Sequence, residues 1–191
     1  PPVIHRRQRQ MCIRDRPYKL NLISIADINS KAANSAAKKL GFQKSTADWM
    51  SLIHDPELDL ISITAPNSLH KDISIAALEA NKHVYCEKPL APTLEETQEM
   101  VKASRRSNKK TQVGFNYLSN PMFCTAKEII ANGDLGEITS FRGIHAEDYM
   151  SDPRSPYTWR HEPVGGGVLA DLGSHILATA EFLLGPIKEV M

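Results

Sequence analysis

The feature that most constrains this chain is a regular alternation of short apolar runs and helical stretches between residues 18 and 115. The apolar runs, rich in β-branched residues, are "KLNLISIADI", "LDLISITAP", "HVYC" and "KTQVGFN". Strands that alternate with helices of roughly 10–15 residues imply βαβ units and a parallel sheet. We therefore expect an α/β domain with an incomplete, doubly wound parallel sheet over residues 18–115.

The ends of the predicted helices carry capping signals. Ser30 is predicted as the N-cap of "SKAANSAAKKLG", and Gly41 as the residue that ends it. Asn81 lies where the helix before "KHVYC" should end, and Asn tolerates the left-handed backbone of that position. Thr93 and Glu96 have the spacing of a capping box. The stretch "STADWMSLI" predicts a further short helix.

Beyond Asn116 the pattern changes. A helix is predicted from about Pro121 to Asn132, and "GEITSFRGIHAEDY" is predicted as a longer strand. The last stretch, "GGGVLADLGSHILATAEFLLG", predicts a helix that is apolar nearly all round and therefore buried. We expect residues 116–191 to be the N-terminal part of a second, α+β substrate domain.

Composition excludes several classes of protein. The net charge is +1, and no apolar run approaches the ~20 residues that span a bilayer, so neither nucleic acid nor a membrane is expected as partner. The three cysteines lack metal-ligand spacing and fit a reducing compartment, so we expect no metal and a cytoplasmic location. Residues 1–17 are rich in arginine; we favour a non-native leader, with a transit peptide or a nucleic-acid-binding arm as alternatives.

Polar residues follow the predicted strands at their carboxyl ends, where open α/β sheets bind ligands. Asp27 ends the first strand, where an acid in dinucleotide-binding folds hydrogen-bonds the adenosine ribose; the alternative is a plain loop or helix-capping aspartate. The Gly-rich turn that should precede it is not found, since the first glycine is Gly41. Thr64, Asn67 and His70 follow the next strand as candidates for cofactor contacts. The alternative is that Asn67 or Ser68 caps the helix and that His70 is a surface residue.

The third strand ends in Glu87, Lys88 and Pro89. An ammonium group there can stabilise charge on a substrate oxygen, Glu87 can tune its protonation, and Pro89 restricts the backbone of Lys88. A cis Lys88–Pro89 peptide bond would fit this role. The alternative is a solvated Glu/Lys pair at a turn.

The last predicted helix carries Asp171 and His175, four residues apart and therefore on one face. Such a pair can act as a general base with its orienting group. The alternative is an internally satisfied core pair. Upstream, Tyr149, Trp159 and Arg160 are candidates for contacts with a polyol, and a packed loop is the alternative.

These segments together resemble the glucose–fructose oxidoreductase, inositol dehydrogenase and MocA (Gfo/Idh/MocA) family. The resemblance covers residues 18–191 and rests on "TAPNSLH", "ALEANKHVYCEKPLA", "VGFNY", "GDLGEI" and "GGGVLADLGSHI". It implies a Rossmann domain that binds NAD, with NADP less likely, followed by a substrate and oligomerisation domain. The chain would then be a fragment truncated at both ends and inactive by itself.

The resemblance also implies roles for individual residues. Lys88 matches a lysine that contacts substrate and nicotinamide ribose, and Asp171 and His175 match a pair in which His175 is the acid/base. Asp27 matches the residue that favours NAD, and Asn67, His70 and Glu87 match cofactor-side positions. The intact protein would be a homo-oligomeric dehydrogenase, dimer or tetramer, that acts on a hydroxyl of a sugar or cyclitol. A non-catalytic dinucleotide- or sugar-binding regulator of the same fold is the alternative.

Overall fold

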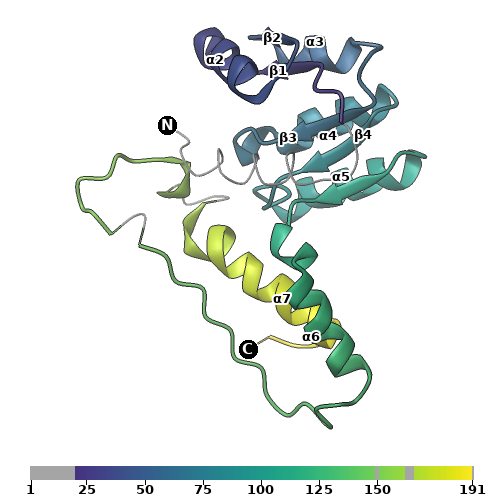
Figure 1. Cartoon of the computed structure of the whole chain (residues 1–191), viewed down its shortest axis with the longest axis vertical. Coiled ribbons are helices and arrows are strands. Elements are labelled where there is room, and N and C mark those ends of the chain that lie inside the picture. The colour runs from purple at the N-terminus through teal and green to yellow at the C-terminus, as the bar shows by residue number, and fades with distance from the viewer. Residues whose placement is uncertain (1–19, 149–150, 162–165, 191) are drawn as a thin grey trace. The chain divides into compact units, whose positions relative to one another are not determined.

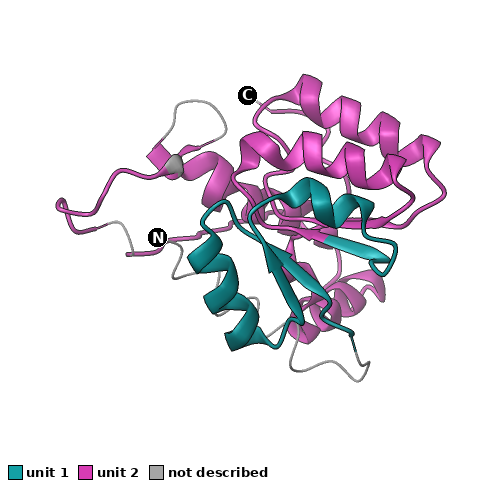
Figure 2. Cartoon of the chain, turned by 90° about the horizontal axis from the view of Figure 1, so that it is seen from above, with its two compact units in different colours: residues 1–61 teal, residues 62–191 magenta. Residues whose placement is uncertain are grey.

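The computed structural model describes residues 20–148, 151–161 and 166–190. The chain divides into two compact units, residues 1–61 and 62–191 (Figure 2). The expected boundaries at 17/18 and 115/116 stay predictions.

The first unit contains a two-stranded parallel sheet and two helices. Its elements are β1 (Ser24–Ala26), α2 (Ser30–Leu40), β2 (Lys44–Thr46) and α3 (Trp49–His54). β1 pairs with β2 in parallel, and Ile25 lies opposite Ser45. The strand β2 was not predicted, because its residues are polar and exposed and carry no apolar pattern. The helix predicted in "STADWMSLI" begins only at Trp49.

The cap of α2 differs from the prediction by one residue. Asn29, not Ser30, is the N-cap, and its Oδ1 accepts hydrogen bonds from the backbone N–H groups of Lys31 and Ala32. An amide oxygen one residue before the helix reaches these donors, whereas Ser30 already has helical geometry. The predicted stop is confirmed: Gly41 has a φ of 85°, in the left-handed region that glycine adopts without strain.

A three-stranded sheet has the order β3 (Leu60–Ile63), β4 (His83–Cys86), β5 (Thr111–Val113); its first strand contains the unit boundary, and the rest belongs to the second unit. β4 and β5 are parallel. The helices α4 (His70–Glu79) and α5 (Leu94–Arg106) connect the strands, as Figure 1 shows. The core is formed by buried apolar side chains that include Ile61, Ile63, Ile73, Ala77, Val84, Cys86 and Met100. The predicted α/β fold with parallel strands is confirmed.

Three further predictions concern the ends of helices in the second unit. Thr93 Oγ1 accepts a hydrogen bond of 3.2 Å from the backbone N–H of Glu96, as the capping-box spacing predicts. Asn81 has a φ of 62°, as predicted. The prediction that Asn67 or Ser68 caps α4 is wrong, because a 3-10 turn, η1 (Asn67–Leu69), precedes the helix and no side chain caps it.

The remaining elements of the second unit are mostly helical. They are the turn η2 (Asn116–Ser119), the helix α6 (Pro121–Ala131), the turn η3 (Trp159–His161), a π-helical segment (Leu169–Gly173) and α7 (Ser174–Leu184). Figure 1 shows α6 beside α7, in agreement with their contacts. The strand predicted in "GEITSFRGIHAEDY" is wrong for residues 137–148, which form no strand. A strand requires a hydrogen-bonded partner, and no described segment pairs with these residues.

The last helix is buried on one face and not all round. Its buried residues are Asp171, His175 and Thr179, spaced four apart, whereas Leu169 and Leu177 are exposed. The expectation of a helix buried all round is therefore wrong, and the polar face points inward. Among the described residues, no helix is long and apolar enough to cross a membrane.

Candidate active site

The turn after β4 brings Lys88 to the site. The backbone N–H of Glu87 donates a hydrogen bond of 3.0 Å to the carbonyl of Ile63, so the end of β4 is held against the end of β3. Gly114 allows a close approach, because a Cβ there would lie 3.2 Å from Glu87 Cα. The Lys88–Pro89 peptide bond is cis, the isomer that would fit the role considered for this turn. The turn is therefore held in place by backbone contacts.

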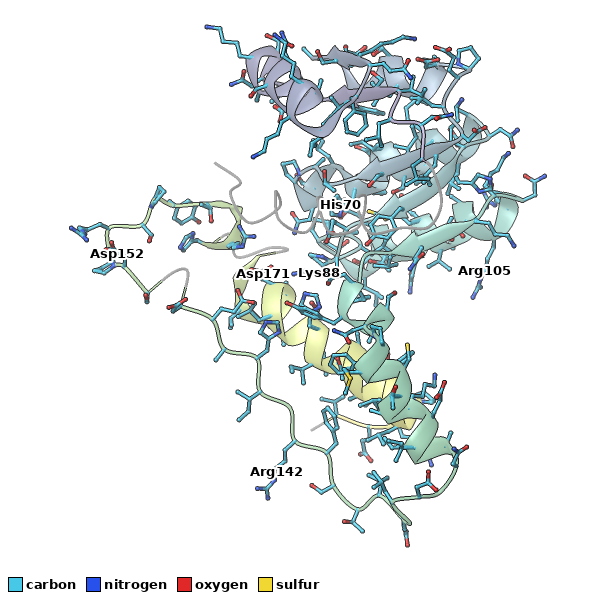
Figure 3. The ribbon with its side chains drawn as sticks, in the orientation of Figure 1. His70, Lys88, Arg105, Arg142, Asp152 and Asp171 are labelled. Carbon is cyan, nitrogen blue, oxygen red and sulfur yellow. The ribbon has the colours of Figure 1, made fainter. Side chains whose placement is uncertain are left out.

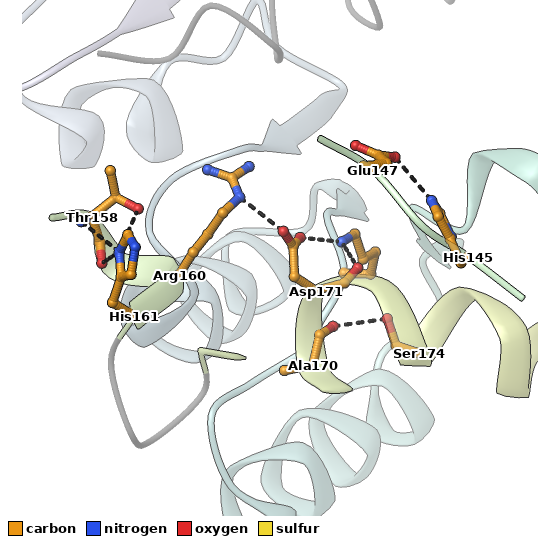
Figure 4. A network of polar contacts seen from close by, with 9 residues as sticks. His145, Glu147, Thr158, Arg160, His161, Ala170, Asp171 and Ser174 are labelled. Atoms are coloured by element: carbon orange, nitrogen blue, oxygen red, sulfur yellow. Dashed lines mark hydrogen bonds and ion pairs between the residues drawn. The ribbon is translucent and has the colours of Figure 1, made fainter. Parts of the chain in front are cut away.

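Lys88 and Asp171, 83 residues apart in the chain, form an ion pair (Figure 3). Lys88 Nζ lies 2.7 Å from Asp171 Oδ1 and also donates to the Asp171 backbone carbonyl. Arg160 Nε lies 2.8 Å from the other carboxylate oxygen, Oδ2, as Figure 4 shows. Asp171 is only 6% exposed, and one cation on each oxygen offsets much of the cost of burying its charge.

His175 lies one helical turn after Asp171 and is also buried. Its ring is surrounded by the rings of Phe115, Tyr117 and His145, and the nearest centroid, that of Tyr117, is 4.6 Å away. Burial lowers the pKa of His175 from 6.5 to about 4, and the positive charge of Lys88 adds to this effect. At neutral pH the imidazole is therefore neutral and can accept a proton.

Sequence reasoning missed the aromatic surroundings of this histidine. Tyr117 and His145 both contact the His175 ring, and His145 Nε2 lies 2.9 Å from Glu147 Oε1 (Figure 4). Burial, followed by the charge of Glu147, raises the pKa of Tyr117. The signal was present in "VGFNY" and "GIHAEDY", but the second segment was interpreted as a strand.

His70 is neither a surface residue nor directed toward an outer ligand. It is 2% exposed, and both ring nitrogens contact backbone carbonyls: Nδ1 lies 2.9 Å from Pro89 O, and Nε2 lies 2.9 Å from Ala65 O. Asn67 is buried too, at 9% exposure, whereas Thr64 is half-buried. Of these residues, His70 contacts the turn that carries Lys88, through Pro89 O.

The other predicted site residues are placed as follows. Glu87 is half-buried, and its Oε2 accepts a hydrogen bond of 3.3 Å from the backbone N–H of Lys88. Asp27, in the first unit, is exposed after β1, and its Oδ1 accepts from the Asn29 N–H. Tyr149 lies outside the described residues, and only the backbone of Trp159 is described.

Some of these residues suit a dinucleotide. An exposed carboxylate at the end of β1 can accept hydrogen bonds from ribose hydroxyls, and Lys88 can donate to a ribose or substrate hydroxyl. A Gly-rich turn for the pyrophosphate is not found in the sequence, whose first glycine is Gly41. Asp27 in the first unit and Lys88 in the second each have, taken separately, the chemistry of a ribose contact.

The fold and the site define an α/β class in which a domain with parallel strands supplies Lys88 and the last helical segment supplies Asp171 and His175 of one buried cluster. Residues 3–115 match the model of the oxidoreductase family with the NAD-binding Rossmann fold, GFO_IDH_MocA, and residues 123–191 match the GFO/IDH/MocA C-terminal domain. The chain belongs to the Gfo/Idh/MocA family, as its motifs indicated.

Several characterised proteins are similar to this chain. A levoglucosan dehydrogenase from Pseudarthrobacter phenanthrenivorans is 43% identical over 168 residues, which cover 87% of this chain and 43% of the relative. An inositol 2-dehydrogenase from Salmonella typhimurium is 34% identical over 128 residues, which cover 66% of this chain and 38% of the relative. A structure of levoglucosan dehydrogenase in complex with NADH and levoglucosan has a TM-score of 0.82 and 43% identity, covering 85% of this chain and 44% of that one. The chain spans about half the length of the relatives it matches.

Proposed function

We propose that the full-length protein is an NAD-dependent dehydrogenase that oxidises a hydroxyl group of a cyclic polyol. The observation that carries this proposal is the buried Lys88–Asp171 ion pair, at 2.7 Å, one helical turn from a neutral His175. An amine that can stabilise an oxyanion and an imidazole that can accept a proton are the two groups that removal of a hydroxyl proton requires.

In this mechanism each residue has a separate task. His175 accepts the proton of the substrate hydroxyl, and Lys88 donates a hydrogen bond to the same oxygen as negative charge develops on it. Asp171 holds Lys88 in place, and its negative charge partly opposes the lowering of the His175 pKa by burial and by Lys88. NAD, when bound, supplies the acceptor for the hydride. The protein contributes position and electrostatics.

The names of the relatives support a cyclic polyol as the substrate class. They include levoglucosan dehydrogenase, inositol 2-dehydrogenase and 1,5-anhydro-D-fructose reductase. The three compounds in these names each contain a ring that carries several hydroxyl groups. Asp27 favours NAD over NADP, because a carboxylate beside the ribose repels a 2′-phosphate.

Turnover of variants in the full-length protein tests this function. We expect Lys88→Ala and His175→Ala each to lower kcat with NAD and the best polyol of a panel by about 10²–10⁴-fold, as expected for loss of acid–base and charge stabilisation. Lys71→Ala is the matched control, since Lys71 lies near Glu96 and Glu99, away from this cluster, and its variant should keep normal turnover. Near-normal turnover of both site variants would contradict the proposal. NADH binding by the parent without turnover across the panel would favour the regulator.

Two further proposals concern the whole protein. We expect a homo-oligomer, dimer or tetramer, in the cytoplasm. Sedimentation equilibrium of the full-length protein measures the first, and fractionation of cells measures the second.

A further inference from the structure

His70 connects the two segments that end β3 and β4. Its ring is among the most buried large side chains of the described residues. Nδ1 contacts the carbonyl of Pro89, which follows β4, and Nε2 contacts the carbonyl of Ala65, which follows β3, both at 2.9 Å. One imidazole therefore lies between the two loops at this end of the sheet and contacts both.

The contact at Pro89 fixes the backbone beside Lys88. The turn is anchored on its other side by the hydrogen bond from Glu87 N to Ile63 O. Lys88 lies between these two anchors, and its amine must reach Asp171 through a flexible side chain. A shift of this backbone would move Nζ relative to Asp171 and to any substrate oxygen.

The imidazole of His70 cannot donate a hydrogen bond to both carbonyl oxygens while it is neutral. Carbonyl oxygens only accept hydrogen bonds, whereas a neutral imidazole has one N–H donor and one lone pair. Burial lowers the pKa of His70, against the contrary effect of the carbonyls of Pro89, Ala65 and Leu90. A neutral ring can donate to one carbonyl at a time, so the two contacts are not equivalent.

We propose that His70 is a positioning residue of the active site, whose Nδ1–H donates to Pro89 O and so holds the Glu87–Pro89 turn in the geometry that aims Lys88 at Asp171. The proposal rests on the proposed function for its kinetic consequences, but its structural claim stands on the contacts alone.

Two isosteric substitutions separate the two contacts in the full-length protein. The Asn amide is as many bonds from Cα as Nδ1, so His70→Asn can still donate to Pro89 O. The Gln amide corresponds to Nε2, so His70→Gln can donate only to Ala65 O. Ser74→Ala, a buried site one turn further along α4, is the control for disturbing the helix.

We expect His70→Gln to lower kcat by about 10²-fold, as a misplaced catalytic group does, with little change in the KM for NAD. His70→Asn and Ser74→Ala should keep kcat near that of the parent. A merely structural role would instead lower kcat in both His70 variants in proportion to their loss of Tm. Equal kcat in the Asn and Gln variants would overturn the proposal.

A second measurement is independent of activity. An amine-acetylating reagent labels Lys88 at a rate that mass spectrometry can follow. This rate reports whether the amine stays in its buried ion pair. We expect faster labelling in His70→Gln and the parent rate in His70→Asn. Equal labelling rates in both would overturn the positioning role even if the protein proves to be a regulator, whereas an inactive parent with the expected labelling would refute only the dehydrogenase.

Discussion

At the scale of single residues, Asp171 determines how the site is held together. Its two carboxylate oxygens each meet a different cation, Lys88 at 2.7 Å and Arg160 at 2.8 Å, with little exposure to water. Removing the shared carboxylate leaves two buried cations without their counter-ion. Removing one of the two cations leaves the carboxylate paired with the other. The three residues therefore do not contribute equally to stability.

We predict that Asp171→Asn lowers the free energy of unfolding of the full-length protein by about 3–5 kcal/mol, the usual cost of breaking a buried ion pair. Lys88→Met should cost less, because Asp171 keeps Arg160. Urea unfolding followed by circular dichroism measures both. Equal losses in the two variants would show that the carboxylate is not shared in solution.

The lowered pKa of His175 predicts how stability depends on pH. The unfolded chain binds a proton at this residue below about pH 6.5, whereas the folded state does so only near pH 4. The contribution of His175 to the free energy of unfolding is therefore present in full above pH 6.5, and it is lost as the pH is lowered from 6.5 toward 4. Burial lowers the pKa of His70 too, so His70 adds to the same loss.

Urea midpoints at pH 7 and pH 5 test this dependence. The full-length parent should lose more stability between these values than His175→Gln, which has no titrating ring at this position. Identical losses in the two proteins would mean that His175 titrates normally in the fold.

At the scale of secondary-structure elements, helix ends depend on single side chains that the sequence shows. α5 begins with Thr93, whose hydroxyl accepts from Glu96 N, and places Glu95 and Glu96 in its first turn and Arg105 and Arg106 in its last. Acids at the start and bases at the end both suit the helix dipole. The sequence predicted this helix and its cap for these local reasons.

We predict that Thr93→Ala lowers the free energy of unfolding by about 1 kcal/mol, because a backbone N–H loses its acceptor. Thr93→Ser, which keeps the hydroxyl, should lose much less. Chemical denaturation of the full-length protein measures the difference, and equal losses would assign the effect to the methyl group of Thr93.

At the scale of the whole molecule, the second unit exposes large apolar side chains beyond its sheet. Val168 and Leu169 are each 72% exposed, Ile144 is 90% exposed, and Met122 on α6 is 73% exposed. Exposed apolar surface of this kind marks a site of association.

We predict that a polypeptide of residues 1–191 self-associates at micromolar concentration in light scattering. Replacing Leu169 and Leu177, both exposed, by Lys should raise its solubility without loss of helix content. The matched control is Lys substitution of two exposed polar residues. A monodisperse monomer of the parent polypeptide would contradict the prediction.

Local patterns in the sequence predicted most of the first two-thirds of the fold. Apolar runs bounded by turns predicted β1, β3, β4 and β5, and Gly41, Asn81 and Thr93 predicted helix ends, because each depends on neighbours a few residues away. Strand prediction from local patterns failed twice: β2 was not predicted, and the strand predicted in residues 137–148 is absent. Both failed because a strand forms only where another strand pairs with it.

The sequence by itself also determined which residue types lie at the site: the Glu87-Lys88-Pro89 turn after a strand and the one-turn spacing of Asp171 and His175. Only the tertiary structure decided which of these residues contact one another and which are buried. It paired Lys88 with Asp171 across 83 residues, buried the polar face of α7, and turned His70 inward between two backbone carbonyls. The physical reason is that spacing and capping act within a few residues along the chain, whereas burial and ion pairing depend on which distant segments pack together.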